Sequence, residues 1–211
     1  ENKPLWYDFL AHTLTLLIEK KVARLELVNI PLNTFITKIL SSTNAAVEMK
    51  NLFRTLKQCS TSARYDFFNE YTTALKNIGI DDSFTTPYYL SLTHAQEMEK
   101  AGHEIGGHTT SHPTLSQLGR VEATDEIAGG KEAFESNGLT LQSFAYPFGE
   151  KSDIAYDTPG IAKQAGFSFA VTTEEKSIDP ENFDPYRLSR KVVSPQSLPQ
   201  LALKIEMLSW K

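Results

Sequence analysis

The segment His103-Glu-Ile-Gly-Gly-His-Thr-Thr-Ser-His-Pro113 contains the sharpest signal in this 211-residue chain. Gly102 is suited to end the helical pattern that precedes it, and residues 103–107 then predict a short strand leading into a polar loop. The two glycines before the loop permit close backbone approach, and Pro113 disfavours the helical region for His112. The sequence therefore predicts a strand that delivers a shaped loop with two histidines.

The same alternation of helices and strands continues on both sides of this segment. A capping box formed by Thr93 and Gln96 predicts the start of the preceding helix. The later predicted elements are a helix over 116–137, a strand over 141–149, a helix from Thr158 to Gly166, a strand over 167–173, a strand over 186–193 and a helix over 198–210. This order indicates parallel βα units, in which ligand chemistry gathers at the C-terminal ends of the strands.

The first part of the chain differs from the rest in composition. The first glycine is Gly79, and only Pro4 and Pro31 precede it among the ten prolines. Apolar residues recur at helical spacing in runs that begin near residues 5, 47 and 67. We therefore expect a helical subdomain over residues 1–87 and a βα portion over residues 88–211.

Composition and charge narrow the range of functions. The chain is 40% hydrophobic and 22% charged, as is typical of a globular domain with its own core. Its formal net charge is -5, with 21 basic residues scattered along the chain, so the basic surface that nucleic-acid binding requires is not expected. No run of 18 apolar residues predicts a membrane span, and the single cysteine, Cys59, excludes an intramolecular disulfide.

The pair His108 and His112 is the sharpest chemical signal. Two imidazoles four residues apart in a loop can bind one ion of the zinc class. Five histidines in 211 residues produce roughly 0.1 such pairs by chance, so the evidence for a site comes from the loop rather than from the spacing. The alternative is a pair of partly buried histidines bonded to the backbone.

Two other segments are weaker candidates. Ala145-Tyr-Pro-Phe-Gly149 predicts a turn at a strand end, where a backbone N–H can face an oxyanion, although such turns are more often structural. Asp81 and Asp82 can supply a carboxylate ligand or form a solvated turn. The chain contains no G-x-S-x-G segment, so a serine hydrolase is not supported.

Several of these segments together resemble the polysaccharide deacetylase family, also called the NodB-homology domain. The similar segments are 92–116, 126–135, 144–149 and 165–173, so the resemblance spans about residues 88–193. Residues 4–8 resemble the start of a helical insertion that some members carry between their first two motifs.

The resemblance implies a distorted (β/α) barrel and a metal-dependent hydrolase that removes N-acetyl groups from an N-acetylated sugar polymer. In that case His108 and His112 are the metal ligands, and the backbone N–H of Tyr146 helps to hold the oxyanion. The metal expected is Zn²⁺, with Co²⁺, Mn²⁺, Fe²⁺ or Ni²⁺ as alternatives. Family members act mostly on cell-envelope or extracellular glycans, whereas the residues themselves leave the compartment open.

The chain departs from the family pattern at three points. It has no counterpart of the Thr-Phe-Asp-Asp-Gly type motif that supplies a metal-binding and a base aspartate, so no base is found. Ala145 stands where many members have arginine, and the late Leu-x-His is not found near residues 201–211. Arg190 is a candidate for binding substrate or orienting a carboxylate, or else a solvated strand-end residue.

These departures leave two interpretations. In the first, the chain is a fragment of an active deacetylase that lacks the N-terminal strand with the first motif. In the second, it is a catalytically inactive carbohydrate-binding or glycan-assembly module on the same scaffold. Two imidazoles without a carboxylate hold metal poorly, so metal affinity and turnover separate the two interpretations.

Overall fold

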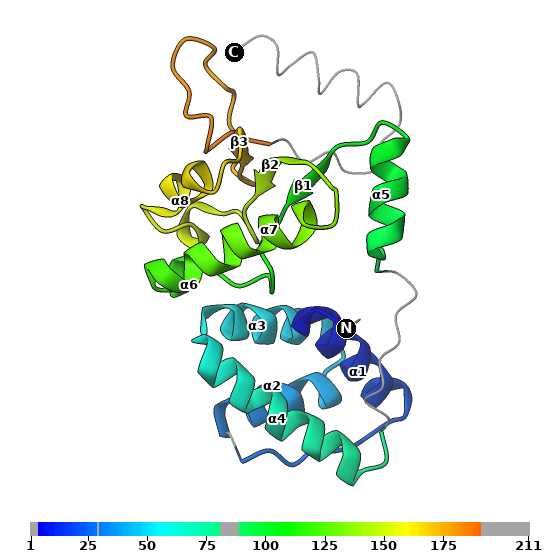
Figure 1. Cartoon of the computed structure of the whole chain (residues 1–211). Helices are drawn as coiled ribbons and strands as arrows, with labels where there is room; N and C mark the ends of the chain where they lie inside the picture. The colour runs from blue at the N-terminus through cyan, green and yellow to red at the C-terminus, as the bar shows by residue number, and fades with distance from the viewer. Residues whose placement is uncertain (1–3, 29, 81–88, 191–211) are drawn as a thin grey trace, which may run out of the picture. The chain divides into compact units, whose positions relative to one another are not determined.

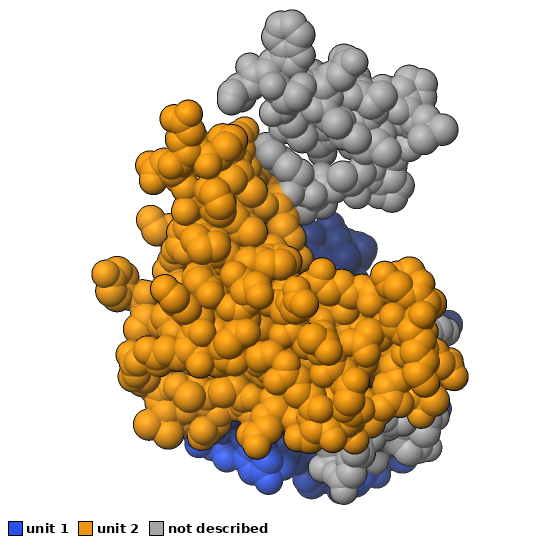
Figure 2. Space-filling model, turned by 45° about the horizontal axis from the view of Figure 1, so that its top comes forward, with its two compact units in different colours: residues 1–89 blue, residues 90–211 orange. Residues whose placement is uncertain are grey.

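A computed structural model describes residues 4–28, 30–80 and 89–190. The chain divides into two compact units, Glu1–Tyr89 and Leu90–Lys211 (Figure 2). Within the described residues, no helix is long and apolar enough to cross a membrane. The predicted helix over 198–210 and the Asp81–Asp82 pair lie outside the described residues.

The first unit is built from helices (Figure 1). These are α1 (Trp6–Glu19), α2 (Ile30–Ser41), α3 (Ala45–Gln58) and α4 (Thr61–Asn77). The apolar runs predicted α1, α3 and α4 but not α2. Its signal is in the sequence, because Pro31 occupies the first turn and Leu32, Ile36 and Ile39 recur at helical spacing and are buried.

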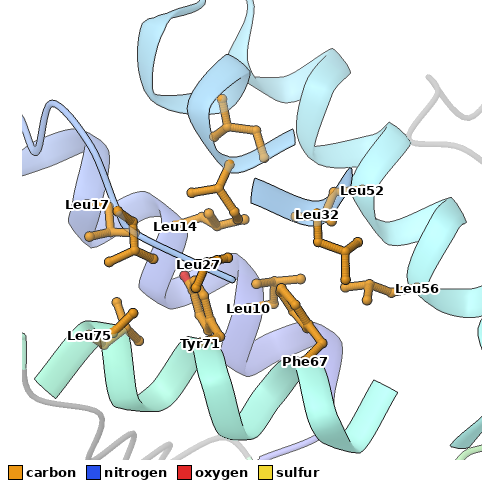
Figure 3. Close-up of a cluster of buried hydrophobic side chains, with 14 of the residues drawn as sticks. Leu10, Leu14, Leu17, Leu27, Leu32, Leu52, Leu56, Phe67, Tyr71 and Leu75 are labelled. Atoms are coloured by element: carbon orange, nitrogen blue, oxygen red, sulfur yellow. The ribbon is translucent and has the colours of Figure 1, made fainter. Parts of the chain in front are cut away.

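Apolar side chains from these helices form one core. Figure 3 shows Leu10, Leu14 and Leu17 of α1 pointing toward Phe67, Tyr71 and Leu75 of α4. The hydroxyl of Tyr71 lies in this core and shares a hydrogen bond of 3.0 Å with Thr13 Oγ1, so its polar atom is satisfied. The helical unit therefore has a core of its own.

The second unit contains a three-stranded parallel sheet and helices (Figure 1). Its elements are α5 (Leu92–Lys100), β1 (Ile105–Gly107), α6 (Arg120–Thr124), a π-helical segment (Asp125–Gly129), α7 (Gly130–Glu135), β2 (Leu141–Ala145), α8 (Thr158–Gln164) and β3 (Phe169–Val171). The strand order is β1-β2-β3, with Phe144 paired to both Gly107 and Ala170. The α/β class with parallel strands is confirmed.

The predicted strands over 103–107, 141–149 and 167–173 are shorter in the structure, at Ile105–Gly107, Leu141–Ala145 and Phe169–Val171. Three other details also differ from the sequence prediction. The side chain that caps α5 is Ser91, which accepts from the backbone N–H of His94, rather than Thr93. The predicted helix over 116–137 begins only at Arg120 and is interrupted by the π-helical segment. The predicted strand over 186–193 is reduced to a single parallel bridge between Val171 and Leu188, and its last three residues lie outside the described chain.

The core of the second unit lies against the sheet. Phe144, Tyr146 and Phe167 are almost fully buried, and the Phe144 ring lies 5.2 Å from that of Tyr146 and 5.1 Å from that of Phe167. Lys131 is also buried, and its ammonium donates to the carbonyl of Leu141 and lies over the Phe167 ring. This packing fixes the strands whose ends form the site described below.

Candidate functional site

The predicted histidine pair lies at the C-terminal edge of the sheet. His108 directly follows β1, and its ring centroid lies 4.7 Å from that of His112, with the ring planes 77° apart. The His108 side chain is exposed and that of His112 is half-buried. The loop between them thus places both imidazoles together at an accessible position, as the spacing predicted.

One hydrogen bond sets the tautomer of His108. Its Nδ1 lies 2.6 Å from the carbonyl oxygen of Ala145, the last residue of β2. Because a carbonyl only accepts, Nδ1 must carry the proton, and the lone pair of the neutral ring is then on Nε2. An imidazole held in this way by a backbone carbonyl is the usual arrangement of a metal-binding histidine. The parallel pairing of β1 and β2 brings these two strand ends together.

The backbone around the pair is strained. Thr109, His112 and Phe148 all have positive φ angles, of 66°, 57° and 60°. Non-glycine residues rarely adopt this region, and such residues cluster at functional sites. The His112 ring also lies 4.8 Å from the Phe148 ring in an edge-to-face contact, so the two strained loops meet through these side chains.

The predicted turn at Tyr146 is held against the end of β3. Thr173 donates its backbone N–H to the carbonyl of Gly149 at 2.9 Å and its hydroxyl to the carbonyl of Phe148 at 2.9 Å. Gly149 has a φ of 74°, and an added Cβ would lie 2.9 Å from the Thr173 nitrogen, so only glycine fits this position. The turn is therefore a rigid part of the strand edge.

The backbone N–H of Tyr146, the predicted oxyanion donor, donates to the carbonyl of Val171 at 3.2 Å. In this structure it belongs to the hydrogen bonding of the sheet. The Tyr146 hydroxyl donates to the carbonyl of Tyr186 at 2.7 Å, and burial raises the pKa of this phenol well above its ordinary value. The side chain therefore supports the fold, and only the backbone of Tyr146 remains a candidate for catalysis.

Arg190 lies just beyond the bridge between Val171 and Leu188. Its Nε donates to the carbonyl of Thr172 at 2.7 Å, and its backbone N–H donates to the carbonyl of Glu174 at 3.2 Å. Arg190 is exposed, so the rest of its guanidinium faces solvent at the edge where the strands end. A role for Arg190 in binding substrate or orienting a carboxylate stays a prediction.

Glu126, which holds the histidine loop, was not among the site residues predicted from the sequence. Its Oε2 accepts the backbone N–H groups of Thr110 at 2.9 Å and Ser111 at 2.8 Å, and its Oε1 accepts the Ser111 hydroxyl at 2.6 Å. A glutamate within a helical pattern normally indicates a solvated face. The available signal was the adjacent pair Gly129 and Gly130, since glycine inside a helix often marks a close approach.

The described donors that could hold a metal ion are the imidazoles of His108 and His112. Two neutral imidazoles suit zinc and related divalent ions, and the fixed tautomer of His108 fits that role. Within residues 4–28, 30–80 and 89–190, no group of three or more His, Cys, Asp or Glu side chains is placed to hold a metal ion. The residues thus fit two ligands of such a site, and a complete site needs another donor.

An apolar hollow of about 380 Å³ lies elsewhere in the second unit, among residues of α5, β1 and α7 that include Leu92, Ile105 and Phe134. Its lining contains neither histidine. The histidine pair is therefore an open feature of the strand edge and does not belong to this hollow.

The second unit is therefore an α/β fold in which a parallel sheet has a histidine pair at its C-terminal edge. The model of the polysaccharide deacetylase family matches residues 58–170, which is more than half of the chain. The chain therefore belongs to the polysaccharide deacetylase family, and the resemblance in its motifs is confirmed.

A solved structure supports the same fold. The chain is similar to the Streptococcus pyogenes deacetylase PplD, a structure in complex with acetate, with 24% sequence identity and a TM-score of 0.50. The match covers 66% of this chain and 64% of that one, so the chain spans about two thirds of the deacetylase. No curated protein matches the chain significantly.

Proposed function

We propose that the chain is part of a metal-dependent polysaccharide deacetylase that removes N-acetyl groups from an N-acetylated glycan. The observation that carries this proposal is the hydrogen bond from His108 Nδ1 to the Ala145 carbonyl, which leaves Nε2 as the ligand atom beside His112. Membership of the family supports the reaction class. The exposure of His108 suits a polymer, which must reach the site from the surface.

His108 and His112 would hold the metal, most simply Zn²⁺, with Co²⁺, Mn²⁺, Fe²⁺ or Ni²⁺ as alternatives. When bound, the ion would lower the pKa of a water molecule and polarise the amide carbonyl. The chain's own residues orient the site: the Ala145 carbonyl fixes the His108 ring, and Phe148 contacts the His112 ring. The N–H of Tyr146 donates to the Val171 carbonyl. It would stabilise the oxyanion only through a bifurcated hydrogen bond to both oxygens.

A complete active site would need a third metal ligand and a catalytic base in addition to His108 and His112. We propose that the three parallel strands are one arc of a distorted (β/α) barrel, because the bridge from Val171 to Leu188 continues the parallel order beyond β3. A carboxylate that completes the metal site and an aspartate base would come from a further barrel segment. Arg190, beyond that bridge, would bind substrate or orient such a carboxylate.

The second candidate is a catalytically inactive glycan-binding module. It is favoured by the lack, within the described residues, of a third metal-binding side chain near the pair. In such a module the histidines would still lie at the open strand edge, and neither metal retention nor acetate release would be required of it.

Metal retention and acetate release distinguish the two candidates. The experiment titrates the purified chain with Zn²⁺ and, separately, measures acetate released from N-acetylglucosamine oligomers with Zn²⁺ present. The variants His108→Ala and His112→Ala test the pair, and His103→Ala is the matched control because it removes an exposed imidazole from the same strand-loop segment.

Because the pair supplies only two ligands, we expect weak Zn²⁺ binding. Both loop variants should lose this binding, and the control should retain it. Acetate release that depends on the pair would establish the enzyme. Zn²⁺ binding without acetate release would mean that this chain holds the metal but lacks residues that catalysis needs. A chain that binds oligomers but neither Zn²⁺ nor Co²⁺ would refute the proposal and favour the binding module.

A further inference from the structure

One carboxylate holds the middle of the histidine loop. Glu126, in the π-helical segment Asp125–Gly129, accepts two consecutive backbone N–H groups and one hydroxyl from Thr110 and Ser111. These three hydrogen bonds lie between 2.6 and 2.9 Å. Hydrogen bonds to an ionised carboxylate are about twice as strong as neutral ones, so this is a firm attachment of the loop.

The same helical face contacts the loop a second time. Gly130 lies one turn beyond Glu126, and a Cβ added there would meet the Thr109 carbonyl carbon at 3.3 Å and the Thr110 nitrogen at 3.4 Å. The neighbouring Gly129 has no heavy atom within 4 Å of an added Cβ. The loop therefore packs closely against one face of this helix, and π-helical segments of this kind are frequent at functional sites.

The attachment acts on the residues between the two ligands. Thr109 and His112, on either side of the bonded pair, both have positive φ, and the Thr109 hydroxyl accepts the backbone N–H of His112 at 3.0 Å. A backbone in this region persists only when its surroundings hold it there. The carboxylate bonds to two of the three residues that separate His108 from His112.

We propose that Glu126 is a positioning residue that holds the loop so that His108 and His112 face one metal ion. This inference rests on the proposed function, and it adds a residue that acts through the loop rather than by touching the metal or substrate. Residues of this kind orient the ligands, and their loss typically weakens metal binding by roughly 10- to 100-fold.

The test compares folded variants of this chain in a Zn²⁺ titration. Glu126→Ala removes all three bonds, whereas Glu126→Gln retains a carbonyl oxygen for the two backbone N–H groups and an amide that can donate to the Ser111 hydroxyl. The matched control is Glu132→Ala, which removes an exposed carboxylate from α7, the next segment of the same helical stretch. Amide hydrogen exchange of Thr110 and Ser111 is measured on the same samples without metal.

We expect Glu126→Ala to bind Zn²⁺ roughly 10- to 100-fold more weakly. Glu126→Gln should fall between it and the wild type, and Glu132→Ala should match the wild type. Exchange of the two amides should accelerate only in the Glu126 variants. Should Glu126→Ala fail to fold, the comparison of Glu126→Gln with Glu132→Ala decides the question.

Unchanged Zn²⁺ affinity in a folded Glu126→Ala chain would overturn the inference and leave the proposed function intact. Equal losses in Glu126→Ala and Glu132→Ala would do the same. A wild-type chain that binds no Zn²⁺ would instead refute the proposed metal site, and with it the positioning role. Faster exchange with unchanged affinity would show that Glu126 only fastens the loop, and it would also overturn the inference.

Discussion

Replacing Gly107 by alanine is expected to destabilise the second unit. An added Cβ would lie 2.6 Å from Cζ and 2.9 Å from Cε1 of Phe167, and 3.2 Å from Cδ2 of Phe144. Carbon atoms in contact are normally about 3.5 to 4.0 Å apart, so the Phe167 ring would have to move by about 1 Å. Both rings are almost fully buried and pack against each other, so neither has free space beside it.

The magnitude follows from overpacking. Inserting a methyl group into a well-packed core typically costs about 1 to 3 kcal/mol of unfolding free energy. The matched control is Gly129→Ala, because a Cβ there meets nothing within 4 Å in a helical backbone. Alanine should stabilise that position by roughly 0.8 to 1 kcal/mol. The same substitution is therefore expected to have opposite signs at the two glycines.

Urea unfolding followed by circular dichroism measures this difference, with amide exchange of β2 identifying the second unit. With a slope of about 1 to 3 kcal/mol per molar urea, the two midpoints should be separated by roughly 1 M or more. A Gly107→Ala midpoint equal to or above the wild type would contradict this prediction, because it would mean that the Phe167 ring moves at no cost in free energy. Equal shifts in both variants would refute it as well.

Three further predictions concern two tyrosine side chains and one helix cap. Tyr146→Phe should lower the unfolding free energy by about 1 to 3 kcal/mol, because the Tyr186 carbonyl loses its donor, yet leave Zn²⁺ binding unchanged; equal stability in urea would contradict this. Burial, together with the Asp8 charge, raises the pKa of Tyr7 to about 12, so its contribution to stability should be complete below pH 10 and decline as the pH rises toward 12. A titration that follows tyrosinate absorbance and helicity checks this, and ionisation of all tyrosines near pH 10 would oppose it. Ser60→Ala should cost about 1 kcal/mol by removing the cap of α4, and an unchanged thermal midpoint would show that the cap contributes nothing.

Local patterns determined much of the fold. The apolar spacing in the first unit predicted three helices, and the alternation after residue 88 predicted the strands that contain Gly107, Phe144 and Ala170, because amphipathic periodicity reflects which face of an element is buried. Helix α2 was not predicted, and the cap of α5 is Ser91 instead of the predicted Thr93. At these two places local sequence signals compete. Several residue types can cap a helix or continue it, and packing selects among them.

The candidate ligands could also be predicted from the sequence, because only three residues separate His108 from His112. How they are held depends on tertiary contacts: the carbonyl of Ala145 is 37 residues away from His108, and Glu126 is 16 residues from Thr110. The tertiary structure also decided that the Tyr146 N–H bonds to Val171 and that Arg190 bonds to Thr172. Hydrogen bonds between distant residues depend on how the strands and helices pack, and no pattern of neighbouring residue types encodes that arrangement directly.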